Sequence, residues 1–103
     1  MSNSIDLLVV DDDNDYRATL VRRFSRCGYN VHEASDGAEA LERAERRQFD
    51  VAIIDMMMPK VSGFELLEKL KAAQPECEII MLTGSATVET AVKAMKMGAY
   101  DYL

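Results

Sequence analysis

The chain has 103 residues, the length of a single domain, and 49% of them are hydrophobic, enough for a core of that size. Asp and Glu (18) outnumber Lys and Arg (12), and the resulting net charge of −6 argues against nucleic-acid binding by this domain. No apolar run could span a membrane, and one His with two widely separated Cys excludes His-based and Cys-x-x-Cys metal sites. We therefore expect a cytoplasmic domain with reduced thiols, no nucleic-acid partner and no membrane contact.

The first predicted strand covers residues 5–10 and runs directly into three consecutive carboxylates, residues 11–13. A helix follows, for which we predict Asn14 as the N-cap and Gly28 as the C-terminal stop. Apolar residues at helical spacing predict the face of this helix that packs on the sheet. They are Tyr16, Leu20, Val21, Phe24 and Cys27.

A short, half-polar strand is predicted at residues 30–34. Asp36 and Glu39 then have the spacing of a capping box, in which each side chain bonds a free backbone N–H of the first helical turn. The sequence therefore predicts a second helix that begins at this pair and ends near Arg47.

The third predicted strand, residues 51–54, is a continuous apolar run that ends at Asp55. Such a run is typical of a strand buried on both faces, as in a parallel sheet. Asp55 would then lie at the carboxyl end of the strand, where open α/β sheets bind their ligands. An ionised Asp at that position is solvated, bonds loop amides or is held against a cation.

Strand and helix keep alternating to the end of the chain. That alternation predicts an α/β domain with a parallel sheet and helices on both faces. Because the chain stops within the fifth strand and no helix follows, we expect the domain to be incomplete at its C-terminal end. The remaining predicted elements are a helix from the capping-box pair Ser62 and Glu65 to before Pro75, a strand at 78–82, a helix ending at Gly98 and a strand at 99–103.

Polar side chains follow three of the predicted strands. In a parallel sheet the carboxyl ends of the strands meet at one edge, which brings together Asp11, Asp12, Asp55 and Thr83. Three carboxylates repel one another, and a divalent cation offsets that repulsion. Oxygen ligands without His or Cys suit Mg²⁺, which retains several waters and can hold a phosphoryl oxygen. An Asp beside Mg²⁺ is a candidate nucleophile that forms an aspartyl phosphate, and a Thr hydroxyl can donate to a phosphoryl oxygen.

These features together resemble the receiver domain of two-component response regulators. The matching segments span nearly the whole chain in the order and spacing of that family. They are VVDDD at 9–13, IDMMMP at 54–59, SG at 62–63, MLTG at 81–84 and GAYDYL at 98–103.

The resemblance implies a role for each residue of the constellation. Asp55 would be phosphorylated by a partner histidine kinase or phosphotransfer protein. Asp12 and Asp55 would bind Mg²⁺, or Mn²⁺ in its place, together with the backbone carbonyl of Met57. Asp11 would act through a metal-bound water. The switch residues would be the hydroxyl of Thr83 and the aromatic ring of Tyr102.

The resemblance also implies a flavodoxin-like, doubly wound sheet of five parallel strands in the order 2-1-3-4-5, without the last helix of that fold. Residues 1–103 would form one incomplete receiver domain. It would control a C-terminal effector domain, with transcription as the expected output, and could form a homodimer on activation. Its own chemistry would be limited to self-phosphorylation from small donors and autodephosphorylation, so we do not expect an enzyme. The family's Lys beyond the fifth strand has no counterpart here, which leaves the phosphorylation competence of the chain open.

Three alternatives use the same residues differently. A haloacid-dehalogenase-like phosphohydrolase would use Asp11 as the nucleophile and Asp13 as the acid/base. A pseudo-receiver would be an interaction module without the phosphorylation switch. An EF-hand loop would need Gly and Glu where Tyr16 and Arg22 stand, which excludes it.

Overall fold

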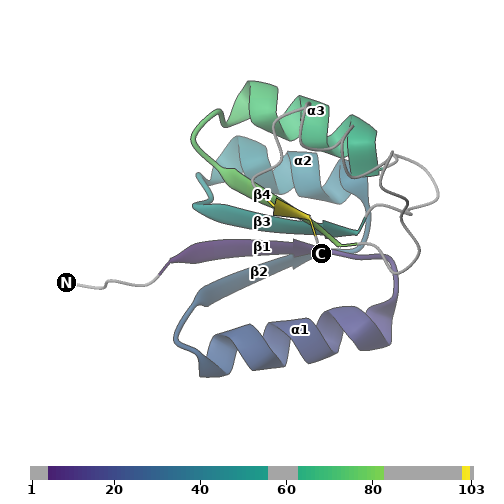
Figure 1. The fold of residues 1–103 in the computed structure, drawn as a ribbon, viewed down its shortest axis with the longest axis vertical. Helices are drawn as coiled ribbons and strands as arrows, with labels where there is room; N and C mark the ends of the chain where they lie inside the picture. Colours follow the sequence, from purple (N-terminus) through teal and green to yellow (C-terminus); the bar gives the residue numbers. More distant parts are fainter. Residues whose placement is uncertain (1–4, 56–62, 83–100, 103) are drawn as a thin grey trace.

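The computed structural model of the chain describes residues 5–55, 63–82 and 101–102 (Figure 1). None of the helices in these ranges is long and apolar enough to cross a membrane. The elements are β1 (Asp6–Val10), α1 (Asn14–Arg26), β2 (Asn30–Ala34), α2 (Gly37–Arg46), β3 (Val51–Asp55), α3 (Gly63–Ala73), β4 (Glu78–Leu82) and β5 (Asp101–Tyr102).

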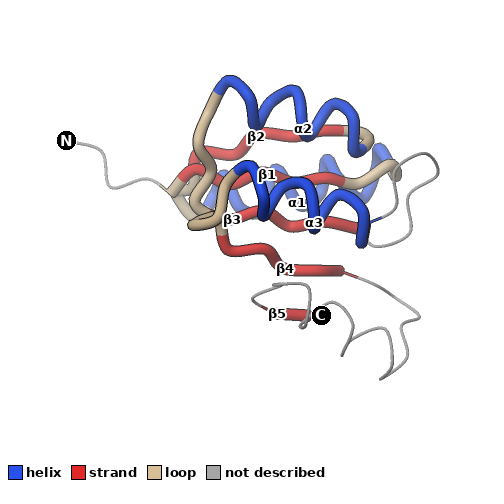
Figure 2. The backbone as a smooth tube through the Cα atoms, turned by 90° about the horizontal axis from the view of Figure 1, so that it is seen from above, coloured by secondary structure: helices blue, strands red, loops and turns tan. Residues whose placement is uncertain are grey.

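The strands form one parallel sheet in the order β2-β1-β3-β4-β5. Helices α2 and α3 cover one face of this sheet, and α1 lies against the other (Figures 1 and 2). The predicted doubly wound architecture and strand order are therefore confirmed. The predicted helix before Gly98 and the capping residue Ser62 lie outside the described residues.

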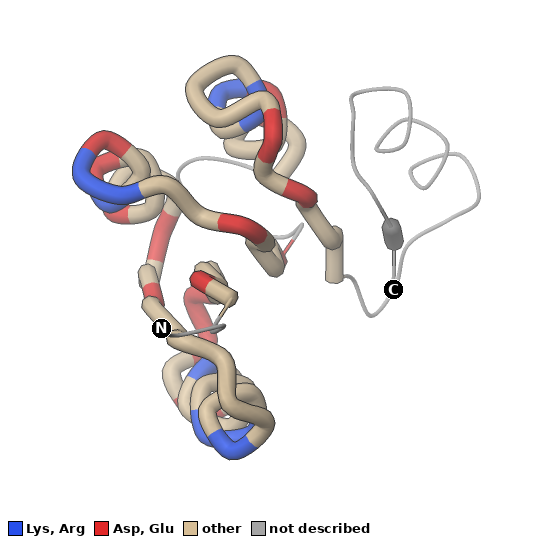
Figure 3. Tube along the Cα trace, turned by 90° about the vertical axis from the view of Figure 1, so that its left-hand side faces the viewer, with Lys and Arg blue, Asp and Glu red and all other residues tan. Residues whose placement is uncertain are grey.

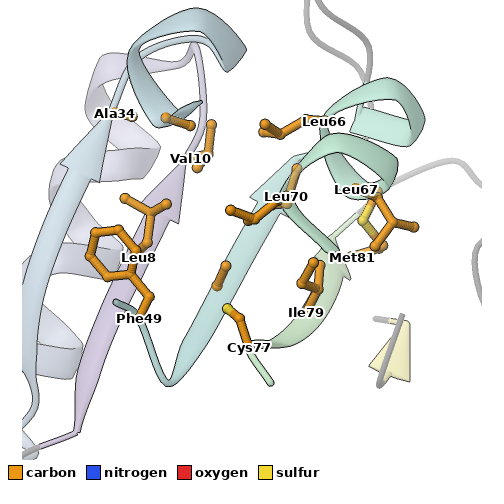
Figure 4. Close-up of a cluster of buried hydrophobic side chains, with 13 residues drawn as sticks. Leu8, Val10, Ala34, Phe49, Leu66, Leu67, Leu70, Cys77, Ile79 and Met81 are labelled. Atoms are coloured by element: carbon orange, nitrogen blue, oxygen red, sulfur yellow. The ribbon is translucent and has the colours of Figure 1, made fainter. Parts of the chain in front are cut away.

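The central strands β1, β3 and β4 are apolar except for one acidic residue at an end of each, because both of their faces are covered. In β1, Leu8 and Val10 face α2 and α3, whereas Leu7 and Val9 pack toward Leu20 of α1. Figure 4 shows the larger cluster, between the sheet and helices α2 and α3. Its fully buried members from the strands and α3 are Leu8, Val10, Ala34, Ala52, Ile54, Leu66, Leu67, Leu70, Ile79 and Met81.

The N-cap of α1 is Asp13 rather than the predicted Asn14. One side-chain oxygen of Asp13 accepts hydrogen bonds from the backbone N–H groups of Asp15 and Tyr16, at 3.0 and 3.1 Å. Asp13 has an extended backbone, whereas Asn14 is already helical, so only Asp13 can direct its carboxylate back at the first turn.

The predicted stop of α1 at Gly28 is confirmed. Gly28 has a φ of +94°, which residues with a Cβ rarely adopt. The N–H of Gly28 bonds the carbonyl of Ser25, and the N–H of Tyr29 bonds that of Phe24. This is a Schellman motif, and the Phe24 and Tyr29 rings, 6.0 Å apart, make its apolar contact.

The predicted apolar stripe of α1 is only partly right. Leu20 is buried and Val21 and Phe24 are half-buried, but Tyr16 is 47% exposed and Cys27 is exposed. Tyr16 lies in the first turn of the helix, and Cys27 is its C-cap. Tyr16 instead lines an apolar groove of about 430 Å³ between α1 and the sheet.

The capping box of α2 is confirmed with one change. The Asp36 carboxylate accepts from the N–H of Glu39 at 2.8 Å. The Glu39 carboxylate reaches back to the N–H of Ser35, also at 2.8 Å, one residue before the position that the motif predicts.

Gln74 is a buried polar residue to which the sequence assigned no role. Its side chain is the acceptor for the N–H of Phe49 and donates to the carbonyls of Ala44 and Arg47, all at 2.8–2.9 Å. One amide thus joins the C-terminal ends of α2 and α3 to the segment that enters β3, while it satisfies three backbone groups.

Candidate metal and phosphoacceptor site

The register of the sheet places the acidic residues side by side. Val10 of β1 pairs with Ile54 of β3. Asp11, which follows β1, therefore lies next to Asp55, the last residue of β3. Asp12 follows in the β1–α1 loop. One carboxylate oxygen from each of Asp11, Asp12 and Asp55 lies within 4.8 Å of the other two. The convergence predicted for these three residues is confirmed.

The three carboxylates differ in their surroundings. Asp11 is buried, with 4% of its surface exposed, Asp12 is exposed, and Asp55 is half-buried at the end of β3. The Asp11 carboxylate accepts from the N–H of Asp13 at 2.9 Å. One of its oxygens therefore holds the loop, whereas Asp12 presents its carboxylate to solvent.

Burial raises the pKa of the Asp11 carboxyl above its ordinary value. The N–H of Asp13 and the Arg17 guanidinium act in the opposite direction, and the negative charges of Asp12 and Asp13 raise the pKa further. Burial and the neighbouring negative charges thus outweigh the two contributions that lower the pKa.

In the described elements, Lys and Arg occur on the helices and on none of the strands (Figure 3). A cluster of three oxygen ligands without His or Cys fits a hard divalent cation. Such an ion would offset the mutual repulsion of the carboxylates.

The other predicted site residues fall partly or wholly outside the described residues. Thr83 and the backbone carbonyl of Met57 belong to segments that the structure does not describe. Tyr102 lies in β5, in register with Met81 of β4, but its side chain is also outside the described part.

Comparison with known proteins identifies the family. Residues 7–103 match the family described as "Response regulator receiver domain". The chain belongs to the response regulator receiver family. The acidic pocket of Asp11, Asp12 and Asp55 is the kind of site at which receiver domains bind a divalent metal.

The chain matches only part of each of two curated relatives. It is 41% identical to the transcriptional regulatory protein ZraR of Escherichia coli O157:H7, over 98% of this chain and 23% of that one. It is 39% identical to the response regulator MprA of Mycobacterium leprae, over 94% of this chain and 42% of that one. The chain therefore spans less than half the length of either relative.

Solved structures agree with the fold and the family. A response regulator from Burkholderia pseudomallei, solved with a phosphorylated aspartic acid, a calcium ion and citrate, has a TM-score of 0.92 and 38% identity over 97% of this chain and 59% of that one. A receiver domain protein from Methanospirillum hungatei has a TM-score of 0.93 and 33% identity over 98% of this chain and 81% of that one.

Proposed function

We propose that Asp55 is the residue of this receiver domain that is phosphorylated, by a sensor histidine kinase or a phosphotransfer protein. The observation that carries the proposal is the approach of Asp11, Asp12 and Asp55 to within 4.8 Å of one another at the carboxyl ends of β1 and β3. The phosphorylated aspartic acid in the B. pseudomallei response regulator supports it.

We propose Mg²⁺ as the cation, with Mn²⁺ able to replace it. Asp12 and Asp55 would be direct ligands, and the backbone carbonyl of Met57 would be a third. Asp11 would act through a bound water, which fits its burial and its existing bond to the N–H of Asp13. When bound, the ion supplies positive charge that the carboxylates and the incoming phosphoryl oxygens share.

In the proposed transfer, a carboxylate oxygen of Asp55 attacks the phosphorus of a phosphohistidine. The O–P bond forms as the N–P bond breaks, and the imidazole leaves. Asp55 is well placed for this attack because the rigid β3 strand holds its backbone at the sheet edge. Thr83 would then bond a phosphoryl oxygen, and Tyr102 would report the change to the effector.

The domain-level proposal follows from these roles. Residues 1–103 would act as one cytoplasmic receiver domain, with the effector domain C-terminal to it in the parent protein, and with a transcriptional output. Its own chemistry would be confined to phosphorylation from small donors and autodephosphorylation. It would bind no nucleic acid itself and would form a homodimer on activation.

The phosphohydrolase alternative assigns Asp13 a proton-transfer role that its contacts oppose. The Asp13 carboxylate accepts from two N–H groups of the first helical turn, which hold it at the start of α1. Asp11, the nucleophile in that alternative, is buried.

Incubation with phosphoramidate and Mg²⁺, followed by intact-mass and peptide analysis, tests the proposal. We expect one added phosphoryl group on the peptide containing Asp55, and none in Asp55→Asn. The matched control is Asp13→Asn, which keeps the helix cap and should be phosphorylated like the wild type. Phosphate on the peptide containing Asp11, or no phosphorylation of the wild type, would contradict the proposal.

A further inference from the structure

Arg17, in the first turn of α1, makes three short hydrogen bonds to three different parts of the chain. Its Nη1 donates to the backbone carbonyl of Asp11 at 2.7 Å, and its Nη2 donates to the side-chain oxygen of Asn14 at 2.8 Å. Its Nε donates to the carboxylate of Glu33 on β2, also at 2.8 Å. The side chain is only 14% exposed. Distances of this kind are typical of charge-assisted hydrogen bonds.

The hydrogen bond from Arg17 to the Asp11 carbonyl restrains the backbone of the acidic site. The carbonyl of Asp11 belongs to the peptide group that also contains the backbone nitrogen of Asp12, so the guanidinium restrains the peptide between two of the three carboxylates. The Asp11 N–H bonds the carbonyl of Ala34 at 3.2 Å, and its carboxylate bonds the N–H of Asp13. Arg17 thus restrains the one backbone group of Asp11 that these bonds leave free to turn.

Glu33 anchors the Arg17 guanidinium to the sheet. It lies within β2, in register with Val9 of β1, so the guanidinium connects the β1–α1 loop to the sheet itself. Glu33 also offsets the positive charge of Arg17, which would otherwise oppose a cation at the site.

We infer that Arg17 is a positioning residue for the metal site: through the Asp11 carbonyl and Glu33 it holds Asp11 and Asp12 in the geometry that converges on Asp55. This inference rests on the proposed function and deepens it. The effect comes from the planar fork of the guanidinium, because a Lys ammonium has the same charge but cannot reach three acceptors in these directions.

The test is a titration of each protein with Mg²⁺ alone, at a temperature well below its melting temperature. NMR amide chemical shifts monitor the binding. For Arg17→Lys we expect a dissociation constant raised about tenfold, as for other residues that orient metal ligands. Glu33→Ala, which removes a side chain that is 48% exposed, should also weaken Mg²⁺ binding. In the double variant with Arg17→Lys it should raise the dissociation constant little further, because the two residues act together. The matched control is Arg46→Lys on α2, where Arg46 is exposed and pairs only at 3.7 Å with Glu42, and it should bind as the wild type does.

The dissociation constant of the folded protein separates positioning from stability. A merely structural role would lower the melting temperature of Arg17→Lys and leave its Mg²⁺ affinity unchanged. Unchanged affinity in both Arg17→Lys and Glu33→Ala, with normal binding by the wild type, overturns this inference alone. Failure of the wild type to show Mg²⁺-dependent shifts at residues 10–13 and 54–55 instead overturns the proposed metal site.

Discussion

Asp12 and Asp13 are adjacent acidic residues for which the structure predicts opposite effects of substitution. Asp12 contributes a carboxylate to the cluster with Asp11 and Asp55, whereas Asp13 accepts the N–H groups of Asp15 and Tyr16 as the cap of α1. We therefore expect Asp12→Ala to lose metal affinity without losing stability, and Asp13→Ala to lose stability without losing metal affinity.

The contacts set the size of each effect. Loss of an Asp N-cap costs about 1 kcal/mol of the free energy of unfolding, which lowers the melting temperature of a domain of this size by about 5 °C. At the 4.8 Å limit and in a water-like dielectric, two carboxylates repel by about 1 kcal/mol, so metal-free Asp12→Ala should be as stable as the wild type or slightly more so. Its Mg²⁺ affinity should fall by more than about tenfold.

Thermal melts without metal and Mg²⁺ titrations by NMR measure both quantities on the same samples. Asp13→Asn is the control, because Asn caps a helix as well as Asp does and only the charge is lost. The reasoning is refuted if Asp13→Ala weakens Mg²⁺ binding as much as Asp12→Ala does, or if Asp12→Ala melts lower than Asp13→Ala.

Three further predictions concern the scaffold. Gln74→Leu should lower the free energy of unfolding by about 3 kcal/mol, because it leaves the buried N–H of Phe49 and two carbonyls without a partner. Urea denaturation measures this loss, and a change below about 1 kcal/mol would contradict the prediction. Burial raises the pKa of the Cys77 thiol from 9.0 to about 11, so the unfolded chain loses this proton first and stability should fall as the pH rises from about 9 to about 11. That decline should be smaller in Cys77→Ala, and equal declines in the two proteins would show that Cys77 does not contribute. Gly28→Ala should cost about 1 kcal/mol because of its φ of +94°, although open space surrounds the added Cβ, and unchanged urea denaturation would argue against backbone strain there.

The order and type of the elements could be predicted from the sequence because short, local residue patterns mark each strand and helix of this fold. Strands covered on both faces are continuous apolar runs, and turn or capping residues end them. The bounds predicted for β2 and β4 are those of the structure, Asn30–Ala34 and Glu78–Leu82. Parallel strands also point the same way, so a polar residue after each strand was sufficient to predict the meeting of Asp11, Asp12 and Asp55.

Features that depend on a single dihedral angle or on a distant partner needed the tertiary structure. Asp13 and Asn14 are both good N-caps, and only the extended backbone of Asp13 decided between them. Similarly, five apolar residues at helical spacing were predicted to pack on the sheet, but the structure leaves two of them, Tyr16 and Cys27, exposed.

Two long polar side chains, Arg17 and Gln74, also needed the tertiary structure before their roles could be recognised. Arg17 and Gln74 are unremarkable in sequence, since such residues are usually solvated on helices. Their partners lie 16 positions away in Glu33 and 25 positions away in Phe49, and those distances close only when the sheet and helices pack. The sequence by itself determined the sheet and the acidic edge, because buried strands are continuous apolar runs and the alternation of strands with helices makes the strands parallel. Tertiary structure alone decided which side chains hold that edge in place, because a hydrogen bond between remote residues leaves no periodic trace.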